Sequence, residues 1–107
     1  MSHVSVKTMK DALKATRAPV IFSHSSAKAL CDNPRNVPDD VLALVRENSG
    51  LVMVNFYSAF IKCDGSEATV ADVANHIDHI RSKCGVECVG IGSDYDGVST
   101  LPKGVCV

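Results

Sequence analysis

The stretch Val20-Ile21-Phe22-Ser23-His24-Ser25-Ser26-Ala27 decides how the fold is interpreted. It begins with a short apolar run, which predicts a buried strand, and the run ends at His24 and small hydroxyl residues. Proteins built from alternating strands and helices present their ligands at the carboxyl ends of the strands. His24 is therefore a candidate ligand-binding residue, although a histidine that follows an apolar run is more often structural.

Helix and strand patterns alternate along the whole chain. Helices are predicted at residues 5–16, 38–47 and 69–83, and strands at residues 20–23, 51–56 and 87–92. The helical segments repeat apolar residues every three or four positions, whereas the strand at 51–56 is apolar without alternation, which is typical of a parallel strand covered on both faces. Regular alternation with short connections predicts right-handed crossovers and a parallel sheet, so the fold class is α/β.

The limits of these elements are also predicted. Ser5 is expected to cap the first helix, Pro38 to take the first position of the second, and Gly85 to end the third. Residues 25–31 are expected to make a short helical turn, and residues 58–67 a polar loop.

Composition limits the classes of function. The chain has 107 residues, 46% of them hydrophobic, and a formal net charge of −1, which fits one globular domain. Basic and acidic residues are interspersed, so no basic patch is expected to attract nucleic acid or an anionic membrane surface. The apolar runs are too short to cross a bilayer, and neither a signal peptide nor a lipid-attachment tail is expected within this sequence.

Five cysteines in so short a chain suggest an oxidising compartment, but their odd number and irregular spacing do not define a disulfide framework. Cys84 and Cys88 have three residues between them, which is wider than a CxxC pair, and Cys88 lies in an apolar run. We expect these two cysteines to be buried or partly buried thiols.

Polar residues that follow parallel strands converge, because such strands end on the same side of the sheet. His24 follows the first predicted strand, Asn55 lies near the end of the second, and Asp94 comes shortly after the third, while His3 lies where an earlier strand would end. Two imidazoles and a carboxylate in one place can bind a divalent metal, with Asp94 acting as a base toward its bound water. The alternative is that His3 is a disordered terminal residue and Asp94 an ordinary turn residue.

Other polar residues have competing interpretations. His76 and His79 are one helical turn apart and resemble half of a helical metal site, but a solvated or partly packed helix face is favoured because no third ligand is evident. Ser25 or Ser26 beside a histidine suggests a nucleophile, yet no G-x-S-x-G elbow surrounds them, and small hydroxyls at a strand end more often bind backbone groups. Arg35 is either a surface charge or an anchor for a carboxylate.

Several stretches resemble one known family. They are Ser2-His3-Val4-Ser5, Pro19-Val20-Ile21-Phe22-Ser23-His24-Ser25-Ser26-Ala27, Arg35-Asn36-Val37-Pro38-Asp39-Asp40, Val52-Met53-Val54-Asn55-Phe56-Tyr57 and Gly92-Ser93-Asp94-Tyr95-Asp96-Gly97-Val98. Together they resemble the membrane dipeptidase (renal dipeptidase) family, and the likeness runs nearly end to end. The blocks SHSSA and RNVPDD make it specific.

The resemblance implies a zinc-dependent hydrolase. Members of this family fold as a (β/α)8 TIM-type barrel, carry two zinc ions at its carboxyl face and hydrolyse dipeptides, including cysteinyl-glycine types, and some accept β-lactams. Members are extracellular, attached to the membrane by a GPI anchor and often disulfide-linked homodimers, which nothing in this sequence itself indicates. About three of eight barrel units are present, so residues 1–107 are expected to be a fragment of one metallo-dipeptidase barrel domain.

Site residues are implied position by position. His3 and His24 match the two histidines that bind one zinc ion. Asp94 matches the catalytic aspartate that lies beside the metals and the substrate, and Arg35 matches the arginine that holds the substrate carboxylate.

Cys31 and Cys63 match a family disulfide, whereas other family features are missing. The histidine-x-aspartate pair of the other zinc site, the glutamate that bridges both metals and a further histidine all precede the part of the pattern that is matched. Phe60 stands where some members have a tyrosine near the substrate. We therefore expect the chain alone to bind zinc weakly and not to catalyse. The alternative is a non-catalytic barrel remnant that acts, if at all, through a partner.

Overall fold

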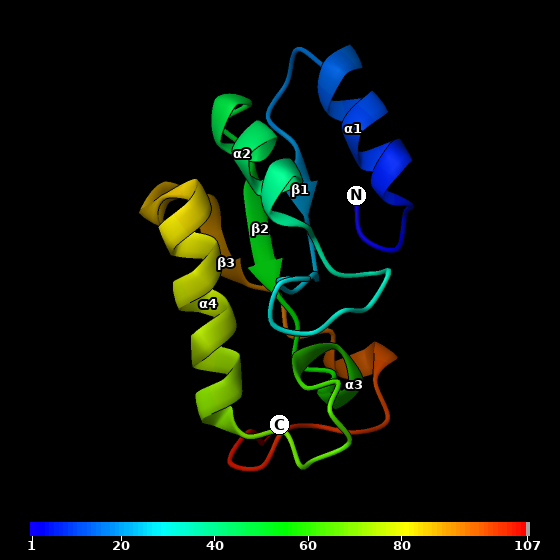
Figure 1. The fold of residues 1–107 in the computed structure, drawn as a ribbon, viewed down its shortest axis with the longest axis vertical. Coiled ribbons are helices and arrows are strands. Elements are labelled where there is room, and N and C mark those ends of the chain that lie inside the picture. Colours follow the sequence, from blue (N-terminus) through cyan, green and yellow to red (C-terminus); the bar gives the residue numbers. More distant parts are fainter. Residues whose placement is uncertain (107) are drawn as a thin grey trace.

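The computed structural model describes residues 1–106, and at its centre is a parallel sheet of three strands with helices packed against it (Figure 1). The strands are β1 (Ile21–Phe22), β2 (Leu51–Val54) and β3 (Val89–Ile91), in the spatial order β1-β2-β3. Phe22 pairs with Val52, and Val52 pairs with Val89, in parallel register. The predicted α/β fold with parallel strands is confirmed.

The two faces of the sheet differ in burial, because successive residues of a strand point to opposite sides. Phe22, Val52 and Val54 are fully buried on the face that the helices cover. Ile21, which points to the other face, is 54% exposed. The hydrophobic core therefore lies between the sheet and the helices.

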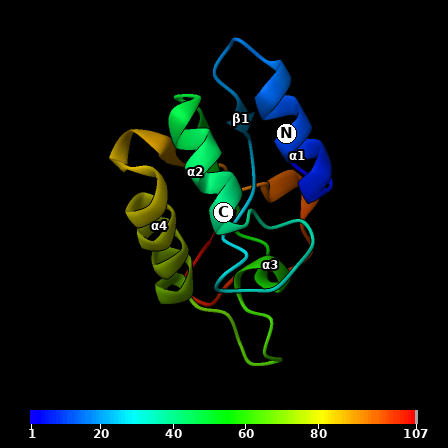
Figure 2. The same ribbon diagram turned by 45° about the horizontal axis from the view of Figure 1, so that its top comes forward.

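The helices of the described residues follow the predicted apolar spacing. They are α1 (Val6–Ala15), α2 (Asp39–Glu47), α3 (Ser58–Ile61) and α4 (Val70–Cys84), with two 3-10 turns, η1 (Val86–Cys88) and η2 (Tyr95–Gly97). Figure 2 shows α2 between α1 and α4, and each of the three helices buries a large side chain, namely Met9, Leu42 and Ile80. None of the helices within residues 1–106 is long and apolar enough to cross a membrane.

The residues at the ends of α1 and α4 act as helix caps. Ser5 is the N-cap of α1, as predicted, and its Oγ accepts a hydrogen bond of 3.1 Å from the Thr8 amide. At the start of α4, Thr69 and Asp72 form a reciprocal capping box. Gly85 ends α4 with φ of 107°, a left-handed conformation that residues with a Cβ rarely adopt.

Two predicted details of the connections are wrong, and a third is confirmed. Pro38 is the N-cap of α2 and not its first residue, because its backbone is extended with ψ of 158°. The turn predicted within residues 25–31 is present at 28–30, where the amides of Leu30 and Cys31 both donate to the carbonyl of Ala27 at 3.3 Å, and Ala27 also forms a parallel bridge with Val37. The loop at 58–67 begins with the short helix α3.

Four of the cysteines are paired. Cys31 is bonded to Cys63, with Cα atoms 5.1 Å apart, and Cys84 is bonded to Cys88, with Cα atoms 5.7 Å apart. The expectation that Cys84 and Cys88 are thiols is wrong, although both are buried as expected. The end of α4 and the turn η1 bring their Cα atoms within the range that a disulfide spans. Cys106 is free and exposed.

Candidate functional site

His3, His24 and Asp94 converge at the carboxyl ends of the strands. His24 follows β1, Asp94 follows β3, and His3 comes from the segment before α1. Nε2 of His24 lies 2.6 Å from Nε2 of His3 and 4.0 Å from Oδ2 of Asp94. One potential ligand atom from each of the three residues lies within 4.8 Å of the others. The predicted convergence is therefore present, and His3 is not a dangling terminal residue.

A serine cluster attaches the amino-terminal segment to the end of β1. Ser2 Oγ accepts hydrogen bonds from the His24 amide at 3.0 Å and from Ser25 Oγ at 3.2 Å. Ser23 Oγ lies 2.9 Å from Nδ1 of His24. When Nδ1 donates this hydrogen bond, Nε2 keeps the lone pair that a metal ion requires. The hydroxyls near His24 thus orient the imidazole, and Ser25 is engaged in this cluster and not placed as a nucleophile.

Two glycines make room for Asp94. A Cβ at Gly92 would lie 1.8 Å from the carbonyl oxygen of Ser23, so only glycine lets the end of β3 pass so close to the end of β1. A Cβ at Gly97 would lie 2.5 Å from Oδ1 of Asp94. Asp94 itself has φ of 62°, a left-handed conformation that aspartate tolerates better than most residues. Asp94 is therefore a turn residue, and the same turn directs it to the site.

A hollow of about 510 Å³ opens beside these residues. It is lined by His3, Arg35, Tyr57, Phe60, Asp94, Gly97, Val98 and Ser99. The guanidinium of Arg35 donates to Nδ1 of His3 and lies 6.0 Å from the centre of the Phe60 ring. Arg35 thus borders the same hollow as two of the candidate metal-binding residues, which is the position that a carboxylate anchor requires.

The electrostatic environment favours a neutral His3. Burial lowers the pKa of the His3 imidazole, and the positive charges of Arg35 and His24 lower it further, whereas Asp94 opposes them. A neutral imidazole is the form that binds a metal ion. Two imidazole nitrogens and a carboxylate oxygen are a donor set that zinc accepts, so the residues present fit one zinc ion.

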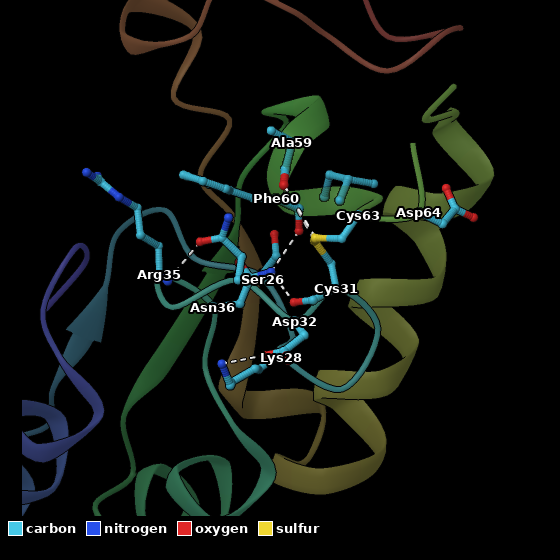
Figure 3. Close-up of a disulfide and its surroundings, with 12 residues drawn as sticks. Ser26, Lys28, Cys31, Asp32, Arg35, Asn36, Ala59, Phe60, Cys63 and Asp64 are labelled. Carbon is cyan, nitrogen blue, oxygen red and sulfur yellow. Dashed lines mark hydrogen bonds and ion pairs between the residues drawn. A yellow bond between two sulfur atoms is a disulfide. The ribbon is translucent and has the colours of Figure 1, made fainter. Parts of the chain in front are cut away.

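A buried polar layer supports the hollow. Ser26 Oγ donates to Oδ1 of Asn55 at 2.8 Å, and both side chains are fully buried. The side-chain amide of Asn36 donates through Nδ2 to the backbone carbonyls of Cys31 at 3.0 Å and Phe60 at 2.8 Å. Figure 3 shows Asn36 and the Cys31–Cys63 disulfide, which together join the loop that carries Arg35 to helix α3.

His76 is the functional candidate that sequence reasoning placed wrongly. It was expected on a solvated or partly packed face, but its side chain is 1% exposed. Its position three residues after Val73 and four before Ile80, both buried, is the signal that could have revealed this. His79 is only partly buried and pairs with Asp39 at 2.7 Å, so the two histidines do not share a site.

Comparison with known proteins supports the resemblance inferred from the motifs. A family model described as membrane dipeptidase, peptidase family M19, matches residues 1–106. An uncharacterised dipeptidase of Schizosaccharomyces pombe, C965.12, is 56% identical over 106 residues, which are 98% of this chain and 26% of that protein. Dipeptidase aclJ of Aspergillus oryzae is 48% identical over 106 residues, which are 98% of this chain and 25% of that protein.

A solved structure gives the same result. The metallopeptidase from Rhodobacter sphaeroides liganded with a phosphinate mimic of the dipeptide L-Ala-D-Ala is similar to this chain with a TM-score of 0.90 and 38% identity. The likeness covers 97% of this chain and 30% of that one. The chain spans about a quarter of the length of the curated relatives it matches. Because the family match extends through all described residues, this chain belongs to the membrane dipeptidase family of metallopeptidases, M19.

Proposed function

We propose that this chain supplies one zinc-binding position, the proton-transferring carboxylate and the substrate-carboxylate anchor of a dipeptidase site. The observation that carries the proposal is the convergence of His3, His24 and Asp94 at the edge of the hollow that Arg35 also lines. A dipeptide offers a peptide carbonyl and a free carboxylate. The metal-binding histidines and Asp94 match the carbonyl, and Arg35 matches the carboxylate.

His3 and His24 would each hold the zinc ion through one ring nitrogen, and for His24 this is Nε2, because its Nδ1 is bonded to Ser23. When bound, zinc acts as a Lewis acid that polarises a carbonyl and lowers the pKa of water. The family's complete site has two zinc ions, and this chain contributes the histidines of one.

Asp94 would accept a proton from attacking water and return it to the leaving amine. Its carboxylate lies 4.0 Å from Nε2 of His24, beside the proposed ion and within the wall of the hollow. General acid–base catalysis requires the carboxylate to lie within reach of the reacting atoms, and a position beside the metal ligands satisfies this.

Arg35 would orient the substrate. A guanidinium can bind both oxygens of a carboxylate through paired hydrogen bonds, which fixes direction as well as position. Tyr57 and Phe60, whose rings meet edge to face at 4.8 Å between centroids, form the apolar wall beside Arg35. The substrate carboxylate and side chain would therefore lie on this side, with the peptide bond toward Asp94.

This chain holds only part of the barrel's metal site, which limits its zinc binding and catalysis when it is alone. The two imidazoles of His3 and His24 leave a zinc ion short of a closed set of protein ligands, and the second ion has no ligands among the described residues that we can assign. We therefore propose that the chain by itself does not catalyse. The second candidate, a non-catalytic barrel remnant that acts through a partner, is favoured by the exposure of Ile21 on the open face of the sheet.

Zinc competition against a chromophoric chelator, combined with an assay for amino acids released from Ala-Ala, tests the proposal. The 107-residue chain should bind less than one tightly held zinc ion per molecule and release no amino acids. His24→Ala should weaken the zinc binding that remains, whereas the matched control His79→Ala, on α4 away from the site, should not change it. Equal zinc binding by His24→Ala and the unsubstituted chain would contradict the assigned site. Hydrolysis of Ala-Ala with stoichiometric zinc would contradict the proposal that the chain by itself does not catalyse.

We also propose an oxidising location, which is compatible with the extracellular, membrane-anchored location and the disulfide-linked dimers of other members. The support is the pairing of four cysteines in residues 1–106, since disulfides persist in oxidising compartments. Alkylation of the protein as it leaves the cell, followed by mass spectrometry, should modify Cys106 alone. Modification of Cys31 or Cys84 would contradict this location.

A further inference from the structure

We propose that His76 is a positioning residue, which holds the segment carrying His24 against helix α3 beneath the hollow. This inference rests on the proposed function, because the site that it positions is the proposed zinc site. His76 belongs to α4 and touches neither the hollow nor the three candidate ligands.

The side chain of His76 is fully used by two hydrogen bonds. Nδ1 accepts from the amide of Ala27 at 2.9 Å, and Nε2 lies 2.8 Å from the carbonyl oxygen of Ile61. Because a backbone amide only donates and a carbonyl only accepts, the ring must be neutral with its proton on Nε2. One tautomer therefore satisfies both partners, and the side chain is 1% exposed.

The bond to Ala27 fixes the segment that begins with His24. Ser25 and Ser26, which lie between them, are buried, and the Ser25 amide donates to the carbonyl of Met53 at 2.8 Å. The segment is thus tied to β2 at one end and to α4 at the other. Without His76 the buried Ala27 amide would lose its hydrogen-bond partner, and this loss favours movement of the segment.

The bond to Ile61 joins the same segment to the substrate side of the hollow. Phe60 lines the hollow, and its carbonyl accepts from Asn36, the neighbour of Arg35. The carbonyls at the end of α3 are those that a helix leaves without an internal partner, and these two side chains satisfy them. His76 therefore links the segment on the metal side to the end of α3 on the substrate side.

Two substitutions separate the two bonds. In His76→Asn the amide oxygen takes the place of Nδ1, so the chain keeps an acceptor for Ala27 and loses the donor to Ile61. In His76→Gln the amide nitrogen takes the place of Nε2, so the chain keeps the donor to Ile61 and loses the acceptor for Ala27. Both variants should be less stable, which a purely structural role also predicts.

The position of the His24 ring distinguishes positioning from stability. The rings of His3 and His24 have centroids 4.6 Å apart, so the zinc-free full chain should show a nuclear Overhauser effect between them. We expect this signal to persist in His76→Asn and to disappear in His76→Gln. Zinc affinity should fall about tenfold or more in His76→Gln and stay close to the unsubstituted value in His76→Asn, a loss similar to that seen when groups behind metal ligands are removed.

A third measurement needs no variant and covers the case in which His76→Gln does not fold. If the Ala27 bond positions the zinc site, zinc must in turn strengthen that bond, by the reciprocity of coupled equilibria. Zinc should therefore slow hydrogen exchange of the Ala27 amide in the unsubstituted chain.

The outcomes separate this inference from the proposed function. Failure of the unsubstituted chain to bind zinc at all would remove the proposed function, and the signal between the histidine rings would still decide the role of His76. Zinc binding with the ring signal intact in a folded His76→Gln, or with Ala27 exchange unchanged, would overturn the positioning role alone.

Discussion

Nε2 of His3 and Nε2 of His24 lie 2.6 Å apart, although the two residues are separated by 21 positions in the chain. Between them the chain forms α1 and turns back into β1. The amide of His24 and the hydroxyl of Ser25 both bind Ser2, so the residue before His3 is attached to the residues around His24. The pair is therefore a product of the fold, and its first member depends on the position of the amino-terminal segment.

This arrangement predicts that the two histidines act on zinc as a unit. His3→Ala and His24→Ala should each weaken zinc binding, because either loss leaves one imidazole alone. The zinc affinity of the double variant should be only slightly lower than that of the single variant with the lower affinity. Chelator competition on the four proteins of the cycle measures the coupling. Strictly additive losses would mean that the two imidazoles bind different ions.

Glycine at position 92 should be required for the fold of the site. Gly92→Ala places a methyl group 1.8 Å from the carbonyl oxygen of Ser23, so we expect a loss of about 1–3 kcal/mol or more in the free energy of unfolding. Gly90→Ala, two residues earlier and within β3, is the matched control, because its methyl group would meet Met53 at 3.4 Å, an ordinary contact. Urea unfolding of both variants checks this, and equal stabilities would contradict the close approach of β1 and β3.

Acid should destabilise the protein through His76. Burial lowers the pKa of His76 below its usual 6.5, so the unfolded chain binds a proton more readily than the folded chain. Stability is therefore complete above pH 6.5 and is lost as the pH falls from there toward the folded-state pKa. Urea unfolding between about pH 7.5 and pH 5 should show this loss. His76→Asn, which does not titrate, should have a flatter profile.

Other charged groups near His76 do not reverse that sign. His79 and Asp72 lie on the same helix and act on its pKa in opposite directions. Asp32, Lys62 and Asp64 line the adjacent hollow beside the Cys31–Cys63 disulfide. Asp39 acts in a separate range, since its hydrogen bond with His79 lowers the pKa of this carboxyl below 3.8, and the stability it contributes is lost only at still lower pH. A profile for His76→Asn identical to the unsubstituted one would assign the acid sensitivity to another group.

The two disulfides should contribute unequally to stability. The Cys31–Cys63 bridge spans a sequence separation of 32, and the Cys84–Cys88 bridge spans 4. In the chain-entropy description a longer loop gives the larger stabilisation, here about 3.7 against about 1.9 kcal/mol. Thermal unfolding of the two paired Cys→Ala variants tests the order. A greater loss on removing Cys84 and Cys88 would show that packing around these buried sulfurs outweighs loop length.

The strongly patterned parts of the fold could be predicted from the sequence. The apolar spacing of α1, α2 and α4 and the uninterrupted run of β2 gave the order of elements, and from that order the convergence of His24 with Asp94 followed. His3 was added because it lies where an earlier strand would end, and the family motifs gave Arg35 its place as the substrate-carboxylate anchor. The structure brings these residues together, while their roles in catalysis remain proposals.

The parts that could not be predicted depend on contacts between distant residues. His76 bonds to Ala27 and Ile61, which are 49 and 15 positions away, and the spacing of a helix face does not reveal which buried histidine has partners. Helix α3 has four residues, which is too short for a periodic pattern to be detected. The bond between Cys84 and Cys88 depends on the turn η1, and the spacing of the two cysteines does not specify the geometry of that turn.

Helix α3 is a single turn, and an isolated turn of helix does not persist in water. Its last carbonyls are held by Asn36 and His76, and the residues just beyond it by the Cys31–Cys63 bridge. The aromatic wall of the hollow is thus not an independently folding piece of the molecule. It forms and opens together with the loop that carries Arg35, so that whatever loosens one side of the hollow loosens the other, and the site is complete or absent as one cooperative unit.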